Sequence, residues 1–356
     1  MKTNRVVRTP GGLSLRVDVR ALVVGVLLLL VALTASVMLI GTGDFPIPAA
    51  DVIRTLLGEG DPGQEFIVTE LRLPRVLVGL LVGASLGLSG ALFQSISRNP
   101  LGSPDVLGLG QGATAGALVM IVLFSGTANQ VALGALVGGL VTGFAIYVLA
   151  WKRGVHGYRL VLVGIGVSAI VTAVNGYLLT KSDIVDAARA IVWMTGSLDG
   201  RDWDQVWPLL ALCAVLVPLV LANSRGLRVM EMGDDVSYAL GVRVERVRML
   251  LMLSAVLLTA SATAASGPVG FVALTAPQLA RRLTLPRCFK GVGGAPMPGP
   301  NLVPSMCMGA ALLVTADWIS QRAFGAEQLP VGVVTGVLGG VYLLWLLVTE
   351  RKAGRI

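Results

Sequence analysis

Long apolar runs recur along the whole sequence, and they constrain the fold more than any other feature. A bilayer core of ~30 Å needs ~20 apolar residues in one helix. Backbone polar groups inside lipid must be satisfied within the segment, so these runs should be helices, and the alternating pattern of a membrane barrel is absent. The sequence therefore predicts an all-α polytopic membrane protein with about ten transmembrane helices, at residues 21–41, 76–96, 104–124, 130–150, 160–180, 206–222, 248–266, 269–283, 302–321 and 330–349.

The charged residues lie mostly between these runs. They make up 13% of the 356 residues, whereas ~25% is usual in a soluble domain. In a soluble protein the net charge of +8 could indicate nucleic-acid binding, but 21 of the 28 Lys and Arg residues lie in alternate segments that begin with the N-terminus. Because cytoplasmic loops carry the excess of Lys and Arg, both termini are predicted to be cytoplasmic, with no nucleic-acid partner.

The spans form one transmembrane domain, 21–349, between cytoplasmic tails at 1–20 and 350–356. The inner loop 223–248 is the largest regular connection, and the inner loop 284–300 is rich in Gly and Pro without a clear helix or strand signal. Glycines at four-residue spacing inside the spans predict faces where helices pack closely. These are Gly79, Gly83 and Gly87, Gly112 and Gly116, Gly134 and Gly138, Gly139 and Gly143, and Gly336 and Gly340.

The sequence offers no catalytic or metal-ligating constellation. His156 is the only histidine, and Cys213, Cys288 and Cys307 stand apart without the spacing of a metal site. There is no G-x-x-x-x-G-K-S/T phosphate loop, so the chain should not bind ATP itself. Ion-coupled transporters usually place ionisable residues or broken helices at the membrane midplane, whereas the predicted spans hold almost no charges at mid-depth. The ion-coupled class is therefore disfavoured but stays open.

A polar turn interrupts the apolar pattern between the second and third spans. Its sequence RNPLGSP predicts a tight inner turn at 98–103, because Asn and Pro break helices there and Arg98 would meet the cytoplasmic surface. The next proline stands where the first turn of a helix tolerates one. The residues of this turn motif are Arg98, Asn99, Pro100, Leu101 and Pro104.

The segment 71–116 resembles the most characteristic region of the FecCD-type permeases, the membrane subunits of ABC importers for ferric siderophores, haem and cobalamin. Two further blocks, GPVGFVALTAPQLARRL at 267–283 and the segment 316–347, are similar to the ferric enterobactin permease branch of that family. The segment 231–242, EMGDDVSYALGV, resembles the family's ATPase-contacting loop. The resemblance covers nearly the whole chain in the expected order.

This resemblance implies a permease subunit that translocates a ferric siderophore across the bacterial cytoplasmic membrane, with haem or cobalamin as alternatives. It implies an ATP-binding subunit dimer that holds ATP and magnesium, an extracytoplasmic siderophore-binding protein, and a second permease subunit. A heterodimer is expected, with a homodimer as the alternative. Iron would arrive as the siderophore complex, so no cofactor or metal is expected on this chain, and lipid surrounds it.

The resemblance also assigns roles to particular residues. Outer arginines would dock the binding protein, although interfacial anchoring fits them as well; they are Arg72, Arg75 and Arg322, the last one place after the family's arginine position at Gln321. ATPase coupling falls on Glu231, Gly233, Asp234, Asp235, Ala239, Leu240 and Gly241. The inner gate falls on His156, Gly157 and Tyr158, and the loop 284–300 is longer than the family pattern and is expected to be an insertion.

Overall fold

The computed structural model describes residues 4–8, 14–43, 45–151, 157–284, 299–323 and 328–352, and these are almost entirely helical. The elements in chain order are β1 (Asn4–Arg8), β2 (Ser14–Asp18), α1 (Val19–Gly41), α2 (Ala49–Leu56), α3 (Pro62–Phe66), the π-helix η1 (Ile67–Arg72), α4 (Leu73–Ser97), α5 (Leu109–Phe124), α6 (Ala128–Ala150), α7 (Gly157–Lys181), α8 (Ile184–Met194), α9 (Trp203–Ala222), α10 (Ser224–Met230), α11 (Asp234–Ala239), α12 (Val244–Ser266), α13 (Val272–Thr284), α14 (Leu302–Arg322) and α15 (Val331–Lys352).

Each predicted span coincides with one of these helices. Among the described residues, seven helices are long and apolar enough to cross a membrane, and two shorter apolar helices lie within α5 and α15. The remaining predicted span corresponds to α13, which has 13 residues. A helix of that length is about 20 Å long, so α13 is shorter than the ~30 Å hydrocarbon core. The helical, multi-span character is confirmed, whereas ten full crossings stay a prediction.

The N-terminal tail departs from the all-α prediction. β1 and β2 form an antiparallel ribbon in which Asn4 lies opposite Asp18. The sequence between the strands contains Pro10 and two glycines, which are typical of turns. A ribbon of two five-residue strands was missed because the tail was interpreted from its charge rather than from its strand pattern.

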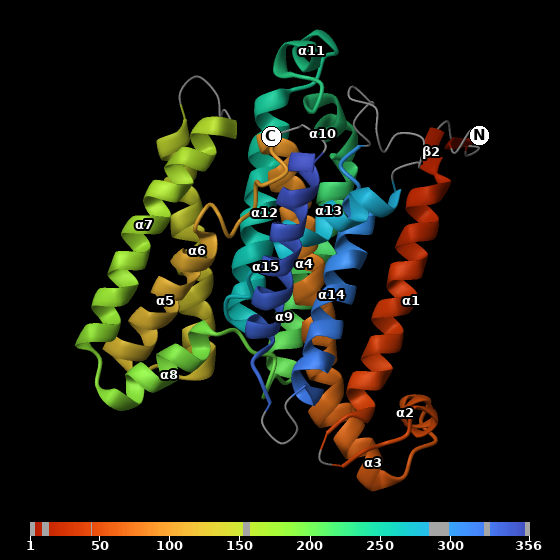
Figure 1. The fold of residues 1–356 in the computed structure, drawn as a ribbon, viewed down its shortest axis with the longest axis vertical. Helices are drawn as coiled ribbons and strands as arrows, with labels where there is room; N and C mark the ends of the chain where they lie inside the picture. Colours follow the sequence, from red (N-terminus) through yellow and green to blue (C-terminus); the bar gives the residue numbers. More distant parts are fainter. Residues whose placement is uncertain are drawn as a thin grey trace.

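The two ends of the helix bundle carry different connections (Figure 1). α1 begins and α15 ends at the end where α10 and α11 lie, whereas α2, α3 and α8 lie at the opposite end. The segments that the charge pattern assigns to one side of a membrane therefore gather at one end of the bundle. The end with α10 and α11 is called the inner end below, and the other the outer end.

Capping residues explain where two of the long helices begin. The backbone N–H of Thr127 donates to Gln130 Oε1 at 2.9 Å before α6, and the N–H of Asp202 donates to Gln205 Oε1 at 2.9 Å before α9. Both are capping boxes, which satisfy the first backbone donors of a helix. The helices thus begin at polar residues directly beside the apolar runs.

α4 forms the centre of the bundle and packs against α9, α12, α13 and α14. A Cβ at Gly83 would collide with the backbone of Gly309 on α14, and one at Gly116 on α5 would collide with Gly134 on α6. The predicted close packing is confirmed at these positions. It is wrong at Gly336 and Gly340, where a Cβ would meet nothing within 4 Å.

Non-helical segments precede the short helices α5 and α13. α5 begins at Leu109, so Pro104 lies in turn structure before the helix rather than in its first turn. The reason is that Arg98, directly after α4, has the left-handed conformation, and the chain keeps turning until Gly108, which is also left-handed. Likewise, α13 begins only after residues 267–271, in which Phe271 has φ 68°.

Candidate functional site

A π-helix shapes the outer end beside α4. η1 runs directly into α4, and Pro74 stands at the junction. Because proline has no N–H to donate, the regular hydrogen-bond ladder cannot continue through this position. Wide helical turns of this kind occur frequently at functional sites. Here the turn ends at Arg72, one of the predicted docking arginines.

Arg72 is engaged inside the chain. Its Nη1 donates to the carbonyl of Ile40 at 2.6 Å and its Nη2 donates to the carbonyl of Phe45 at 2.7 Å. Ile40 belongs to the last turn of α1, whose carbonyls have no partner within the helix. Arg72 therefore ties the end of α1 to the start of α4.

Arg75 lies in a nearly buried charge cluster. Its Nε and Nη2 donate to both carboxylate oxygens of Asp317, at 3.0 and 2.8 Å, and its Nη1 donates to Asp199 at 3.1 Å. The Arg75 side chain is 14% exposed, Asp317 is 1% exposed, and Asp199 is 75% exposed. The bidentate pair joins α4 to α14, and Asp199 covers it from the outside.

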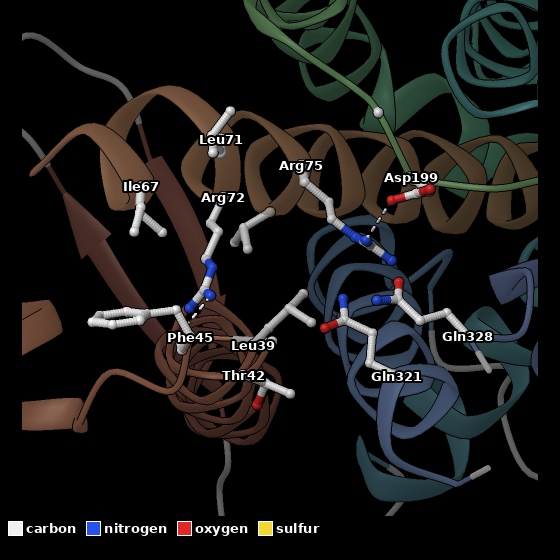
Figure 2. A pocket seen from close by; sticks show the side chains of 13 residues that line it. Leu39, Thr42, Phe45, Ile67, Leu71, Arg72, Arg75, Asp199, Gln321 and Gln328 are labelled. Atoms are coloured by element: carbon white, nitrogen blue, oxygen red, sulfur yellow. Dashed lines mark hydrogen bonds and ion pairs between the residues drawn. The ribbon is translucent and has the colours of Figure 1, made fainter. Parts of the chain in front are cut away.

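These arginines line a pocket of about 300 Å³ at the outer end (Figure 2). Gln321 and Gln328 line it as well, and their side chains reach toward Arg75. Arg322 does not line the pocket; it is exposed, and its guanidinium lies 5.5 Å from the centre of the Trp318 ring. The structure therefore groups two of the three predicted docking arginines and sets the third apart.

The predicted ATPase-contacting loop includes two short helices at the inner end, α10 beside the ends of the long helices and α11 projecting beyond them (Figure 1). Gly241 separates α11 from the start of the long helix α12, and α10 precedes both in the chain. Gly233 and Gly241 have φ values of 122° and 78°, which only glycine adopts easily, and they bracket α11.

The seven residues predicted for ATPase coupling differ in exposure. Asp235, Ala239, Leu240 and Gly241 are exposed, and Gly233 is half-buried. Glu231 and Asp234 instead contact arginines of the transmembrane helices. Met232, Tyr238 and Leu240 are 70%, 55% and 63% exposed. This end thus presents apolar side chains and Asp235 outward, whereas Glu231 and Asp234 point inward to arginines.

Asp234 lies between two arginines. Its Oδ1 accepts from Arg98 Nη2, and its Oδ2 accepts from Arg248 Nη2 at 2.8 Å. Arg248 also donates to Glu245 at 2.8 Å and is 4% exposed. Burial alone would raise the pKa of Asp234, but the hydrogen bond and charge of Arg248, together with Arg98, hold that pKa below its ordinary value.

Glu231 has a different environment. Its side chain is 8% exposed and lies 3.9 Å from Arg281 Nη2. Burial raises the pKa of Glu231 above its ordinary value, and Ser95, Arg281 and Arg228 oppose this only in part. Arg281 also donates to Ser95 Oγ at 3.3 Å, so α13, α4 and the loop before α11 meet at one point.

The turn motif lies beside this cluster. Asn99 Oδ1 accepts from the N–H of Leu101 at 2.9 Å, which closes a local turn. The carbonyl of Pro100 accepts from Gln278 Nε2 of α13 at 2.7 Å. Pro104 is buried, and the motif therefore connects the end of α4 with α13.

The match to known proteins extends over almost the whole chain. A family model described as the FecCD transport family matches residues 26–349. This chain belongs to the FecCD transport family. The resemblance predicted from the sequence is confirmed.

Individual relatives of this FecCD-family chain agree. It is 43% identical to the ferric enterobactin transport system permease protein FepG of Escherichia coli, over 94% of this chain and 98% of that protein. It is 36% identical to the iron(3+)-hydroxamate import system permease protein FhuG of Bacillus subtilis, over 86% and 90%. A solved structure described as an inward-facing metal-chelate type ABC transporter has a TM-score of 0.78 at 26% identity, over 92% of this chain and 99% of that one.

The remaining family-derived predictions concern the inner gate and the insertion. A Cβ at Gly157 would collide with the backbone of Ser97, so α7 begins against the end of α4. Tyr158 is 82% exposed. His156 lies outside the described residues, as does most of the loop 284–300, of which only Thr284, Gly299 and Pro300 are described.

Sequence reasoning missed the acidic and basic partners that hold this FecCD-family chain together. Asp199, Asp317, Arg248 and Arg281 each contact a predicted site residue, yet none was singled out for that role. Position near a predicted span end was the available signal, since a charge there must find a partner or water. Among the described residues, no group of three His, Cys, Asp or Glu side chains could hold a metal ion.

Proposed function

We propose that this chain is the permease subunit of an ABC importer that moves a ferric siderophore across the bacterial cytoplasmic membrane. The observation that carries the proposal is the 43% identity to a ferric enterobactin permease over nearly the full length of both chains. The iron-hydroxamate relative and the metal-chelate transporter structure support the same substrate class. Haem and cobalamin complexes are the alternative substrates.

In this proposal the chain crosses the membrane ten times, with both termini in the cytoplasm, and the short helix α13 makes one crossing together with the non-helical residues 267–271. The support is that α1 begins and α15 ends at the end of the bundle that carries α10 and α11 (Figure 1). The alternating Lys and Arg bias points the same way, because 21 of the 28 basic residues belong to segments assigned to this side.

A partner ATPase dimer binds ATP and magnesium and docks on α10 and α11. Exposed apolar side chains grouped on a small protrusion favour a protein contact. Met232, Tyr238 and Leu240 supply that apolar surface, and Asp235 lies exposed among them. The inward-facing Glu231 and Asp234 support the protrusion rather than contact the partner directly.

The siderophore-binding protein docks at the outer end. Arg322 is exposed there and supplies the direct charge contact. Arg72 and Arg75 line the adjacent pocket. Their hydrogen bonds to α1 and α14 hold the helices around this pocket together. This assignment revises the roles of the three arginines, because two of the guanidinium groups already donate within the chain.

A second, related permease subunit completes the membrane part, with a homodimer as the alternative. Among the seven candidate spans, α7 is the least buried: only 17% of the residues in its most apolar stretch are buried inside the molecule. Its exposed apolar side chains include Leu162, Ile165 and Ile170. Such a face suits lipid or the second permease.

The proposal is tested by purifying the tagged chain together with the ATPase, second permease and binding protein encoded beside it. We expect a stable complex whose ATPase rate in lipid nanodiscs rises when ferric-siderophore-loaded binding protein is added. Haem-loaded and cobalamin-loaded proteins test the alternatives. Failure of the chain to copurify with any ATP-binding subunit would reject the proposal.

A further inference from the structure

The segment 98–105 contacts two separate parts of the molecule, the short helices α10 and α11 and the helix α13. Arg98 at its start bonds to the last residue of α10 and the first residue of α11. The carbonyl of Pro100 bonds to the middle of α13, and Asp105 at its end bonds to the start of α13. Eight consecutive residues thus connect the ATPase-facing protrusion to a helix that spans only part of the bundle.

The contact at Arg98 has two components. Its Nε donates to the carbonyl of Met230, the last residue of α10, at 3.1 Å. Its Nη2 pairs with Asp234, the first residue of α11. One guanidinium therefore holds both short helices against the end of α4, and Arg248 fixes the second oxygen of Asp234.

The segment between the contacts is internally constrained. Asn99 closes the turn through its bond to Leu101, and a Cβ at Gly102 would collide with Ser97. Ser103 is fully buried and its Oγ accepts from the N–H of Val106. Because local hydrogen bonds and burial remove freedom from this stretch, a displacement at one end is passed to the other.

The segment 98–105 forms hydrogen bonds at two points of the α13 region, one within the helix and one just before it. Gln278 Nε2 donates to the carbonyl of Pro100 at 2.7 Å, and the N–H of Phe271 donates to Asp105 Oδ2 at 3.2 Å. Phe271 precedes the helix with φ 68°, after Gly270. A short helix preceded by a non-helical stretch can shift as a unit, whereas a continuous membrane-spanning helix resists such a shift.

We infer that Arg98 is a positioning residue for energy coupling: it transmits movement of α10 and α11 through the segment 98–105 to α13. The inference rests on the proposed function, since it requires an ATPase that moves α11. It accounts for the order of residues in the RNPLGSPD motif, because the arginine, the Pro100 carbonyl and the aspartate each contact a different point along this path. α13 is thereby assigned as the helix that responds to ATP.

The test uses the full complex in sealed proteoliposomes, with radiolabelled ferric enterobactin as the probe and both uptake and ATP hydrolysis measured. Arg98→Ala should lower uptake about tenfold or more, the factor associated with one lost charge-assisted hydrogen bond. Basal ATP hydrolysis should remain, so that more ATP is consumed per iron. Arg98→Lys keeps the charge opposite Asp234 and should recover part of the uptake. Arg246→Ala, an exposed arginine on α12, is the matched control and should match wild type.

Gln278→Met provides a second variant that removes the donor to Pro100 with little change in volume. It should uncouple as Arg98→Ala does, and the double variant should be no worse than either single one, because both break the same path. Additive losses, or wild-type ATP consumption per iron in Arg98→Ala, would overturn the inference. So would a parallel fall of abundance, uptake and hydrolysis that Arg98→Lys does not relieve. If the wild-type complex itself takes up no ferric siderophore, the proposed function fails instead, and the inference falls with it.

Discussion

The guanidinium of Arg75, which was predicted to dock the binding protein, pairs with Asp317 inside the fold. Asp317 is 1% exposed and accepts two hydrogen bonds from one guanidinium. Removing one partner of a buried ion pair costs roughly 3–5 kcal/mol, because the other charge is left without compensation. Arg75→Ala should therefore lower the thermal unfolding temperature in detergent and the membrane abundance. Arg75→Gln combined with Asp317→Asn should recover most of both, whereas equal stability of Arg75→Ala and wild type would contradict this role.

Arg322 is the matched comparison at the same end of the molecule. It is exposed over the Trp318 ring, so Arg322→Glu should leave folding and abundance unchanged. If it contacts a carboxylate of the binding protein, charge reversal should weaken docking by about 2–5 kcal/mol, since like charges would then meet. Surface plasmon resonance with the loaded binding protein measures this directly. An unchanged dissociation constant would exclude Arg322 from the interface.

Glu231 gives a prediction with a defined dependence on pH. Burial raises the pKa of its carboxyl in the folded protein, so the charged form is less favourable there than in the unfolded chain. The wild type should lose stability as pH rises from about 4.3, the ordinary Glu value, through the raised folded-state pKa. Glu231→Gln lacks this loss, so its unfolding temperature relative to wild type should increase between pH 4 and pH 8. A relative unfolding temperature that falls over the same range would show that the ion pair with Arg281 outweighs burial.

At the scale of helices, some glycines allow two helices to pack closely, whereas others have no close neighbour in the described part of the chain. Gly83 faces the backbone of Gly309 on α14, so Gly83→Val should force α4 and α14 apart. Overpacking of this kind costs about 1–3 kcal/mol, measurable as a lower unfolding temperature. Gly336→Ala is the control, because a Cβ there meets nothing within 4 Å. It should be neutral or slightly stabilising through lower chain entropy in the unfolded state.

The helices themselves could be predicted from the sequence, because their apolar runs match the thickness of a membrane. Their starts were predicted less well where local bonds overrule hydropathy. α5 begins at Leu109 rather than near Pro104, since left-handed Arg98 and the turn after it keep the chain out of a helix. α13 begins at Val272 for a similar reason. The pairs of Arg75 with Asp317 and of Arg98 with Asp234 could not be predicted because each joins residues more than a hundred positions apart.

For the whole molecule, the separation of connections between the two ends gives a topology that labelling can test. In a background with Cys213, Cys288 and Cys307 replaced by serine, a cysteine at Ile184 on α8 should react with a membrane-impermeant maleimide on intact spheroplasts. Ile184 is 89% exposed, and so should be readily accessible. A cysteine at Tyr238 on α11 should react only after permeabilisation, because this end faces the cytoplasm in the proposal. The opposite pattern would invert the topology.

The central claim is that this chain moves ferric siderophores with energy from a partner ATPase, and cellular uptake tests it most directly. A strain lacking the chain should lose uptake of radiolabelled ferric enterobactin or another ferric siderophore, and the chain supplied in trans should restore it. Uptake should stop when the partner ATPase carries an inactive phosphate loop, and it should persist when the ion gradients of the inner membrane are collapsed while ATP is maintained. Unchanged uptake of every ferric siderophore in the deletion strain, or uptake that follows the ion gradient instead of ATP, would contradict the account.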